Sequence, residues 1–233
     1  LFEITENGQP LGRFFFDLYA RANKRGGAWM DGARDQRRNA CGQLISPVAN
    51  LVCNFTPAVN GQPALLTHDE VTTLFHEFGH GLHHLLTEVE HAGASGINGV
   101  AWDAVELPSQ FMENWCWEPE GLALISAHFE TGEPLPRDML DKMLAAKNVQ
   151  SGLGMLRQLE HSLFDFKLHA AHGDGRSVLQ VVESIRAEVA VMRPPAYNRF
   201  ANGFARIFAG GCAAGYYSDK WAEVLSADAF SLF

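Results

Sequence analysis

Residues 67–85 carry the clearest hydrophobic pattern of the chain, because apolar side chains recur there at every third or fourth position. These positions are Val71, Leu74, Phe75, Phe78, Leu82 and Leu85. Such spacing places the side chains on one face of a helix. Thr67 followed by Glu70 also matches a capping box, a signature of helix N-termini. The pattern therefore predicts a helix that begins directly after Thr67.

Helical spacing recurs in the second half of the chain, where no internal repeat or low-complexity tract occurs. A helix is predicted from near Asp103 to Trp117, with Pro108 either in its first turn or at a kink. The glycine-rich residues 91–102 before it predict a mobile loop. Further helices are expected at 136–148, 152–172, 175–192 and 213–231.

The N-terminal region has a different pattern. Residues 1–22 alternate in places and contain the turn signal Asn7-Gly8, which predicts a strand or hairpin. A second strand is expected at 51–55, before a turn rich in proline and glycine at 57–63. An edge strand of this region would be able to hold an extended peptide by main-chain hydrogen bonds. The predicted fold is mainly α with a small β-sheet (α+β), in a single domain over residues 1–233.

Composition narrows the classes of partner. The formal net charge of −9 argues against binding to a nucleic-acid backbone, and no run approaches the roughly 18 apolar residues of a membrane span. The four cysteines form no CxxC pair, so free thiols and a cytoplasmic location are expected. Because the chain starts within an apolar stretch and ends without a polar tail, we expect a fragment of a larger protein.

The predicted helix at 67–85 contains the sequence His76-Glu77-Phe78-Gly79-His80, an HExxH motif. Residues four apart lie on one helical face, so both imidazoles are able to reach one metal ion, with Glu77 beside them to act on a water molecule. Zinc is the expected metal, one ion per chain. Gly79 lowers the helix propensity of the motif, which the close approach of another backbone would explain.

A third ligand is expected on the next predicted helix. Glu106 is one candidate and Glu113 is its rival, two turns further along the same face. A histidine ligand also needs an acceptor for its other ring nitrogen. Asp103 and Glu113 are candidates for this second role, and the competing interpretation makes them ordinary surface carboxylates.

Other residues carry weaker signals. His83 and His84 continue the metal-binding helix and are better explained by packing than by a role in the site. The segment from Gly210 to Tyr217 combines small residues with phenols, so Tyr216 or Tyr217 would be able to donate a hydrogen bond to a developing oxyanion. Close packing of helices, in which the small residues allow contact and the aromatic side chains fill the remaining space, explains the same segment equally well.

The sequence resembles the thimet oligopeptidase family of zinc peptidases along essentially its whole length. The resemblance rests on long contiguous runs, namely 24–29 (KRGGAW), 64–84 (ALLTHDEVTTLFHEFGHGLHH), 103–115 (DAVELPSQFMENW) and 208–211 (FAGG) with the Tyr216-Tyr217 pair. It implies zinc bound by His76, His80 and Glu106, with Glu77 as the general base. It also implies a zincin-like helical catalytic domain that hydrolyses short peptides as an endopeptidase.

The resemblance further implies a larger protein, whose two halves enclose a deep channel for short unfolded peptides. This chain resembles the C-terminal, metal-bearing part, so the missing N-terminal half is an expected partner besides peptide substrates. No nucleic-acid or membrane partner is expected.

Four positions depart from the family pattern. Around the glycine pair Arg206, Cys212 and Asp219 stand where family members carry His, Tyr and Tyr, and Asn202 replaces another His. Tyr216 is then the best remaining oxyanion donor, with Tyr217 and Arg206 as substrate-binding candidates. The departures motivate an alternative, in which the chain binds zinc and peptides but is weakened as a catalyst, because loss of one oxyanion donor costs about 10²–10³ in rate.

Overall fold

The computed structural model describes residues 1–233, whose contacts group them into two compact units. Unit 1 comprises Leu1–Leu135 together with Ala222–Phe233, and unit 2 comprises Pro136–Trp221. None of the helices combines the length and the apolar composition that a membrane crossing requires.

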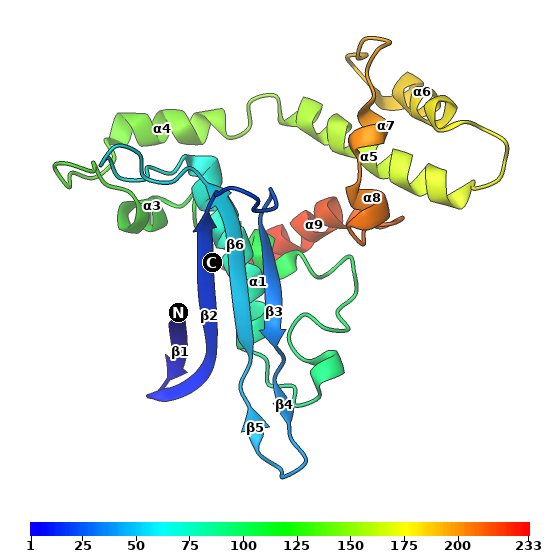
Figure 1. The fold of residues 1–233 in the computed structure, drawn as a ribbon. Coiled ribbons are helices and arrows are strands. Elements are labelled where there is room, and N and C mark those ends of the chain that lie inside the picture. The colour runs from blue at the N-terminus through cyan, green and yellow to red at the C-terminus, as the bar shows by residue number, and fades with distance from the viewer. The chain divides into compact units, whose positions relative to one another are not determined.

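A four-stranded mixed sheet forms the first layer of unit 1, in the order β1-β2-β6-β3 (Figure 1). Its strands are β1 (Phe2–Glu6), β2 (Gln9–Tyr19), β6 (Val48–Phe55) and β3 (Trp29–Arg34). The pair β2 and β6 is parallel, whereas β1 and β3 run antiparallel to their neighbours. A separate ribbon consists of β4 (Arg37–Arg38) and β5 (Leu44–Ile45). The order makes β1 and β3 the edge strands of the sheet.

The predicted hairpin and its turn are confirmed. Asn7 and Gly8 connect β1 to β2, with φ angles of 50° and 78°. These are left-handed conformations, which asparagine and glycine adopt more easily than other residues and which a two-residue hairpin turn requires. The turn lets Phe2 stack on Phe14, with 5.3 Å between ring centroids. The hairpin thereby adds an aromatic face to the sheet.

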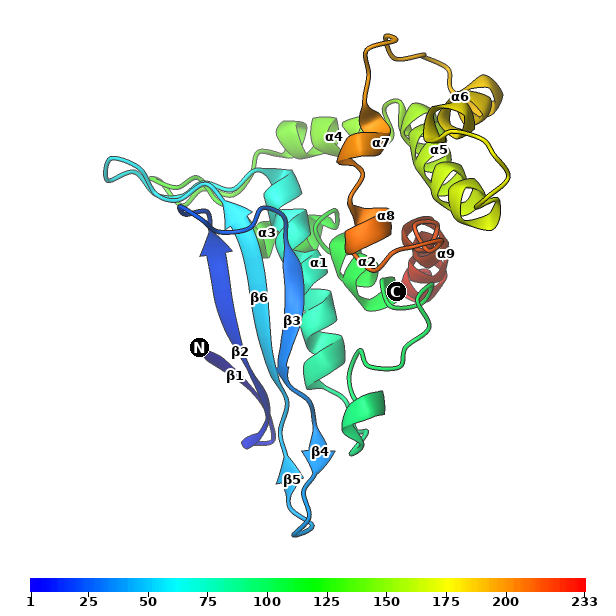
Figure 2. The ribbon, with the colours of Figure 1, turned by 45° about the vertical axis from the view of Figure 1, so that its right-hand side comes forward.

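The long helix α1 (His68–Leu85) covers one face of this sheet (Figure 2). Its capping box is formed as predicted: the Thr67 side chain accepts a hydrogen bond from the Glu70 backbone, and the Glu70 side chain accepts from the Thr67 backbone. Buried apolar side chains of β2, β6 and α1 make the core between the layers, namely Phe14, Ala49, Leu51 and Leu85.

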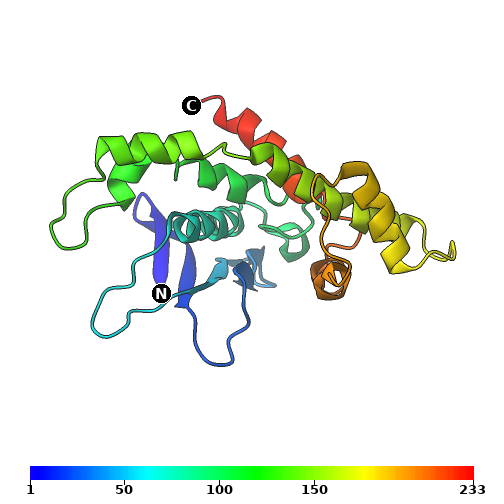
Figure 3. The same cartoon turned by 90° about the horizontal axis from the view of Figure 1, so that it is seen from above.

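A second helical layer covers the other side of α1. Viewed from above, α1 lies between the sheet and α2 (Figure 3), which runs from Leu107 to Asn114. The helix predicted from near Asp103 thus starts four residues later, because turns occupy 102–106. Pro108 lies in the first turn of α2, where its missing N–H has no helical partner to lose.

The remaining elements of unit 1 are short or terminal. They are the 3-10 turn η1 (Ala92–Ala94), α3 (Pro119–Ile125) and the part of α9 (Ser218–Phe230) that begins at Ala222. The glycine-rich loop that the sequence places at 91–102 contains η1 and turns. Phe230 packs edge-on against Phe111 and Trp115 of the α2 region, so the C-terminal residues close the layer behind α2.

Unit 2 is helical. It contains α4 (Arg137–Ala146), α5 (Ser151–Ala170), α6 (Val178–Val189), α7 (Phe200–Gly203) and α8 (Arg206–Ala209). Helices α5 and α6 pack together around buried apolar side chains, which are Phe164, Val181, Val182, Ile185, Ile207 and Tyr216. Across this pair the guanidinium of Arg186 donates to the carboxylate of Glu160 at 2.9 Å, and both side chains are buried.

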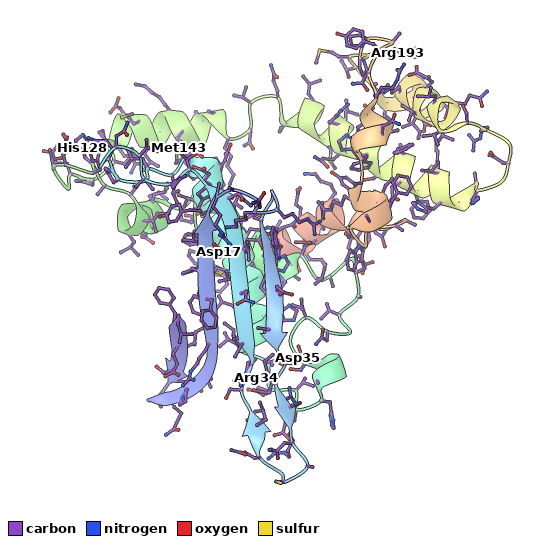
Figure 4. The ribbon with its side chains drawn as sticks, viewed as in Figure 1. Asp17, Arg34, Asp35, His128, Met143 and Arg193 are labelled. Atoms are coloured by element: carbon purple, nitrogen blue, oxygen red, sulfur yellow. The ribbon has the colours of Figure 1, made fainter.

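The loop between β2 and β3 is fastened by a buried ammonium group. The Lys24 side chain is only 4% exposed, and its Nζ donates to the carbonyl oxygens of Asp17, at 2.8 Å, and Tyr19, at 3.0 Å. It also donates to the carbonyl of Cys53, which joins the end of β2 to the end of β6. Figure 4 labels Asp17 at this end of the sheet and Arg34 at the other end. The register of β2 and β6 shifts between Asp17 and Tyr19. At this point the ammonium group supplies hydrogen bonds in place of those between the two strands.

Replacing Lys24 by Met is expected to lower the free energy of unfolding by about 1.5–3 kcal/mol, because three carbonyl oxygens lose a charged donor. Chemical denaturation followed by circular dichroism measures this change. Lys142→Met is the matched control, since the Lys142 side chain is 78% exposed in its pair with Asp138 and is expected to contribute less than about 1 kcal/mol. Equal effects of the two substitutions would contradict the assigned role of Lys24.

Candidate metal centre

The two histidines of the HExxH motif lie one turn apart on α1 and direct their Nε2 atoms toward one carboxylate oxygen. Glu106 Oε2 is 3.2 Å from Nε2 of His76 and 3.0 Å from Nε2 of His80. All three candidate ligand atoms lie within 4.8 Å of one another. Two imidazoles and one carboxylate are a donor set that zinc accepts at tetrahedral angles, with a fourth position left for water or substrate. The residues present therefore fit the expected metal.

Close packing of two backbones brings Glu106 to the histidines. Glu106 is the residue that directly precedes α2, and α2 lies against Gly79 of α1. A Cβ atom at Gly79 would lie 2.4 Å from the carbonyl oxygen of Pro108 and 2.5 Å from Cα of Ser109. The backbone approach proposed to explain the glycine is thus present in the structure. The glycine in the motif allows the third ligand to come close.

Glu113, the rival ligand, lies on the other side of the His76 ring. Its Oε1 is 2.6 Å from Nδ1 of His76, so this carboxylate accepts a hydrogen bond from the nitrogen that faces away from Glu106. Such an acceptor fixes the orientation and the tautomer of a histidine ligand. Asp103, the other candidate for this role, lies in the turn before α2. Its role stays a prediction.

Glu77 is a buried carboxylate beside the three candidate ligands. It is 5% exposed, and its Oε2 is buried without a hydrogen-bond partner. An orphaned acceptor of this kind calls for a donor that the protein itself does not supply, such as water. Burial raises the pKa of Glu77. A carboxylate with a raised pKa and a free oxygen is suited to take and return a proton.

The charges of the cluster stabilise one another. Burial alone would raise the pKa of Glu106, but hydrogen bonds with His76 and His80 outweigh burial and hold that pKa well below its usual range. Burial would lower the pKa of His76, but Glu106 and Glu113 raise it to about 10. The carboxylates thus favour a positive charge at the histidines. A bound metal cation would supply such a charge.

His84, expected to be a packing residue, lies outside the cluster. It is 1% exposed, and its Nε2 is 3.1 Å from the backbone carbonyl oxygen of Arg34 at the end of β3. Its ring fills the space left by Gly32 of β3 and Gly96, where added Cβ atoms would lie 3.0 and 2.6 Å from it. His84 thereby fastens the edge strand β3 and the glycine-rich loop to α1.

The other predicted site residues belong to unit 2. Tyr216 is 9% exposed, and its hydroxyl donates to Oε1 of Gln158 at 3.0 Å. The backbone N–H groups of Ala214 and Tyr216 both donate to the buried carboxylate of Asp165, at 2.9 Å each. Tyr217 is 36% exposed and meets Phe166 edge-on. The proposed roles of the two tyrosines in binding substrate or stabilising an oxyanion stay predictions.

Three of the four departures from the family pattern contact one another. Arg206 donates to Oδ1 of Asp219 at 3.0 Å and to Sγ of Cys212 at 3.4 Å. Its guanidinium also lies 5.4 Å from the ring centroid of Tyr216. Asn202, the fourth departure, is in α7. Arg206, Cys212 and Asp219 thus form a linked cluster, and the role of Arg206 in substrate binding stays a prediction.

Sequence reasoning missed one residue that contacts a candidate ligand. The hydroxyl of Ser109, three residues after Glu106, lies 3.0 Å from Glu106 Oε2. The available signal was its position in the first turn of α2, one turn beyond Glu106 on the same side of the helix.

Comparison with known proteins agrees with the resemblance seen in the motifs. Residues 1–233 match the sequence model of a protein family, which is described as Peptidase family M3. The chain is 64% identical over its full length to oligopeptidase A of Escherichia coli, of which it covers 35%. It is 48% identical to an organellar oligopeptidase A of Arabidopsis thaliana, with 97% of the chain and 30% of that protein covered. A dipeptidyl carboxypeptidase of Escherichia coli is 36% identical over 99% of the chain and 34% of its own length. The chain thus spans about a third of the length of these curated relatives.

Proposed function

Because the chain belongs to peptidase family M3, we propose that it carries the metal centre of a zinc-dependent endopeptidase that hydrolyses short oligopeptides. The observation that carries the proposal is the buried, unpartnered Oε2 of Glu77 beside a set of three ligands that fits zinc. The relatives named oligopeptidase A support peptides as the substrate class. The rest of a full-length family member is the partner we propose, and the free thiols of all four cysteines fit a cytoplasmic location.

His76, His80 and Glu106 would hold the zinc ion. When bound, zinc supplies a Lewis acid for the scissile carbonyl and lowers the pKa of water to about 7. Glu77 would take a proton from the attacking water and deliver it to the leaving amine, which needs a carboxylate that is not committed to another donor. Glu113 would keep the His76 ring in place through Nδ1.

The edge strand β3 would align the substrate. One side of β3 forms main-chain hydrogen bonds with β6. The other side of β3 lies at the edge of the sheet and pairs with no strand of this sheet. An extended peptide is able to add to such an edge by main-chain hydrogen bonds, independently of its side chains. His84 binds the carbonyl of Arg34 and so ties this strand to the helix that carries His76 and His80.

The proposal is tested by cleavage of a short internally quenched peptide by the purified protein. Cleavage is expected to stop on addition of a zinc chelator, to return when zinc is restored, and to be absent in His76→Ala. His172→Ala is the matched control, because His172 is exposed in the turn after α5, and it is expected to cleave at the wild-type rate. Cleavage that survives both the chelator and His76→Ala would overturn the proposal.

The alternative, a catalytically weakened homologue that binds zinc and peptides, is favoured by the cluster of departures. Arg206 forms an ion pair with Asp219 and donates to Cys212, so these side chains are occupied with one another.

Restoring His at 206 and Tyr at 212 and 219 distinguishes the two functions. The alternative predicts a rise in kcat of at least 10²-fold, because each restored donor is worth about 10²–10³ in rate. The leading proposal predicts a change of less than tenfold. Thermal melting of each variant accompanies the assay, since Cys212 is buried and a tyrosine needs more space.

A further inference from the structure

Ser109 lies outside the expected metal-binding residues, and its hydroxyl reaches the ligand oxygen of Glu106. Its Oγ lies 3.0 Å from Glu106 Oε2 and 2.8 Å from the backbone carbonyl oxygen of Glu106. Ser109 is 0% exposed, so water does not compete for this hydroxyl. The same Oε2 is the atom that both histidines face.

This contact restricts how the Glu106 carboxylate turns. A glutamate side chain has several freely rotating bonds, and fixing it at a metal carries an entropic cost. A hydroxyl that donates to the carboxylate holds it in the orientation in which Oε2 points at the histidines. Groups that orient a ligand in this way commonly raise metal affinity 10- to 100-fold.

The position of Ser109 is itself fixed by backbone contact. Cα of Ser109 approaches α1 at Gly79, where even one additional carbon atom would not fit. The hydroxyl therefore starts from a rigid point and reaches a ligand only three residues away. The sequence HEFGH on α1 and the serine on α2 thus act together, the glycine by allowing the approach and the serine by using it.

A purely structural role is the competing explanation. Serine hydroxyls often bond to the carbonyl three residues earlier, and the 2.8 Å contact with the Glu106 carbonyl is of this kind. That bond alone would affect helix stability with or without metal. Donation to Oε2 affects metal affinity, and this difference separates the two explanations.

We propose that Ser109 is a positioning residue that orients Glu106 for metal binding through its hydroxyl. The inference rests on the proposed function in one respect, that the three-ligand cluster takes zinc.

The test compares Ser109→Ala with Ser226→Ala by competition of the protein with a chromophoric chelator for zinc. Ser226 is a matched control, because it is also buried and its hydroxyl accepts from Asn114 at 3.1 Å, away from the ligands. Ser109→Ala is expected to weaken zinc binding 10- to 100-fold. Ser226→Ala is expected to leave it within twofold, with similar melting temperatures for the two metal-free variants.

A double-variant cycle keeps the proposal testable if Ser109→Ala also lowers the melting temperature. In a Glu106→Ala background the serine has no carboxylate to orient, so Ser109→Ala is then expected to change zinc affinity less than twofold. An equal loss in both backgrounds, or an unchanged affinity of Ser109→Ala in the otherwise wild-type protein, would overturn the role of Ser109 alone. Absence of zinc binding by the unaltered protein would overturn the proposed metal centre and this role together.

Discussion

Replacing Glu77 by Gln is expected to lower kcat for peptide cleavage by about 10²–10⁴-fold, because the amide cannot accept the proton of the attacking water. The two side chains are nearly the same size, so the buried space that Glu77 fills stays filled. Zinc content is expected to remain at one ion per chain, since Glu77 is not among the three clustered ligands. Steady-state kinetics and metal analysis on the same preparation check both expectations.

Glu70→Gln is the matched control for this substitution. Glu70 is on the same helix, where its carboxylate accepts from the Thr67 backbone in the capping box. Glutamine fills this capping position as well as glutamate does. The control is therefore expected to retain wild-type kcat. A Glu77→Gln variant that kept more than a third of the wild-type kcat would remove Glu77 from the mechanism.

Replacing Gly79 by Ala is expected to have the second large effect, on stability and metal binding together. The new methyl group would lie 2.4 Å from the Pro108 carbonyl oxygen and 2.5 Å from Cα of Ser109. Backbone atoms cannot rotate away, so α1 and α2 must separate next to Glu106. Overpacking of this kind costs about 1–3 kcal/mol of unfolding free energy, and we expect zinc affinity to fall with it.

Gly81→Ala provides the control, because it changes the same helix in the same way. The nearest atoms to a Cβ at Gly81 would be side-chain atoms of Leu51, the first at 3.2 Å, and not backbone atoms. Alanine also favours the helix over glycine by up to about 1 kcal/mol, which offsets this contact. Denaturation and zinc titration of both variants decide the matter: if Gly79→Ala is as stable and binds zinc as tightly as Gly81→Ala, the backbone contact does not set the site.

The sequence was sufficient for elements that local signals define. The capping box at Thr67 and the spacing of apolar residues located α1 to within a residue, and Asn7-Gly8 located the hairpin turn. The mainly α fold with a small sheet is confirmed. Each of these signals is encoded by neighbours along the chain, so no tertiary contact was needed to interpret it.

Elements held by distant contacts escaped sequence reasoning. β3 (Trp29–Arg34) has no alternating pattern, and it forms through antiparallel pairing with β6 and through the packing of Gly32 on His84. The short helices α3, α7 and α8 were not predicted either, because a few residues carry little periodicity. The chain passes from one compact unit to the other near Leu135, beside Gly132, Pro134 and Pro136.

At the site, the spacing identified the ligand types but not their arrangement. Period alone left Glu113 as a rival of Glu106. The folded backbone shows that Glu106 faces both histidines while Glu113 faces the outer nitrogen of His76. The contact between Ser109 and Glu106 depends on a rotamer, which periodicity does not encode. Packing of α2 on α1 therefore decides the roles of these residues.

The most direct test of the account is X-ray absorption at the zinc edge of the zinc-loaded protein. A zinc ion held by His76, His80 and Glu106 is expected to show two imidazole nitrogens at about 2.0–2.1 Å and oxygen ligands at about 2.0–2.2 Å. One imidazole is expected to be lost in His80→Ala. A sulfur ligand at about 2.3 Å, or a spectrum that His80→Ala leaves unchanged, would contradict a metal centre built from His76, His80 and Glu106.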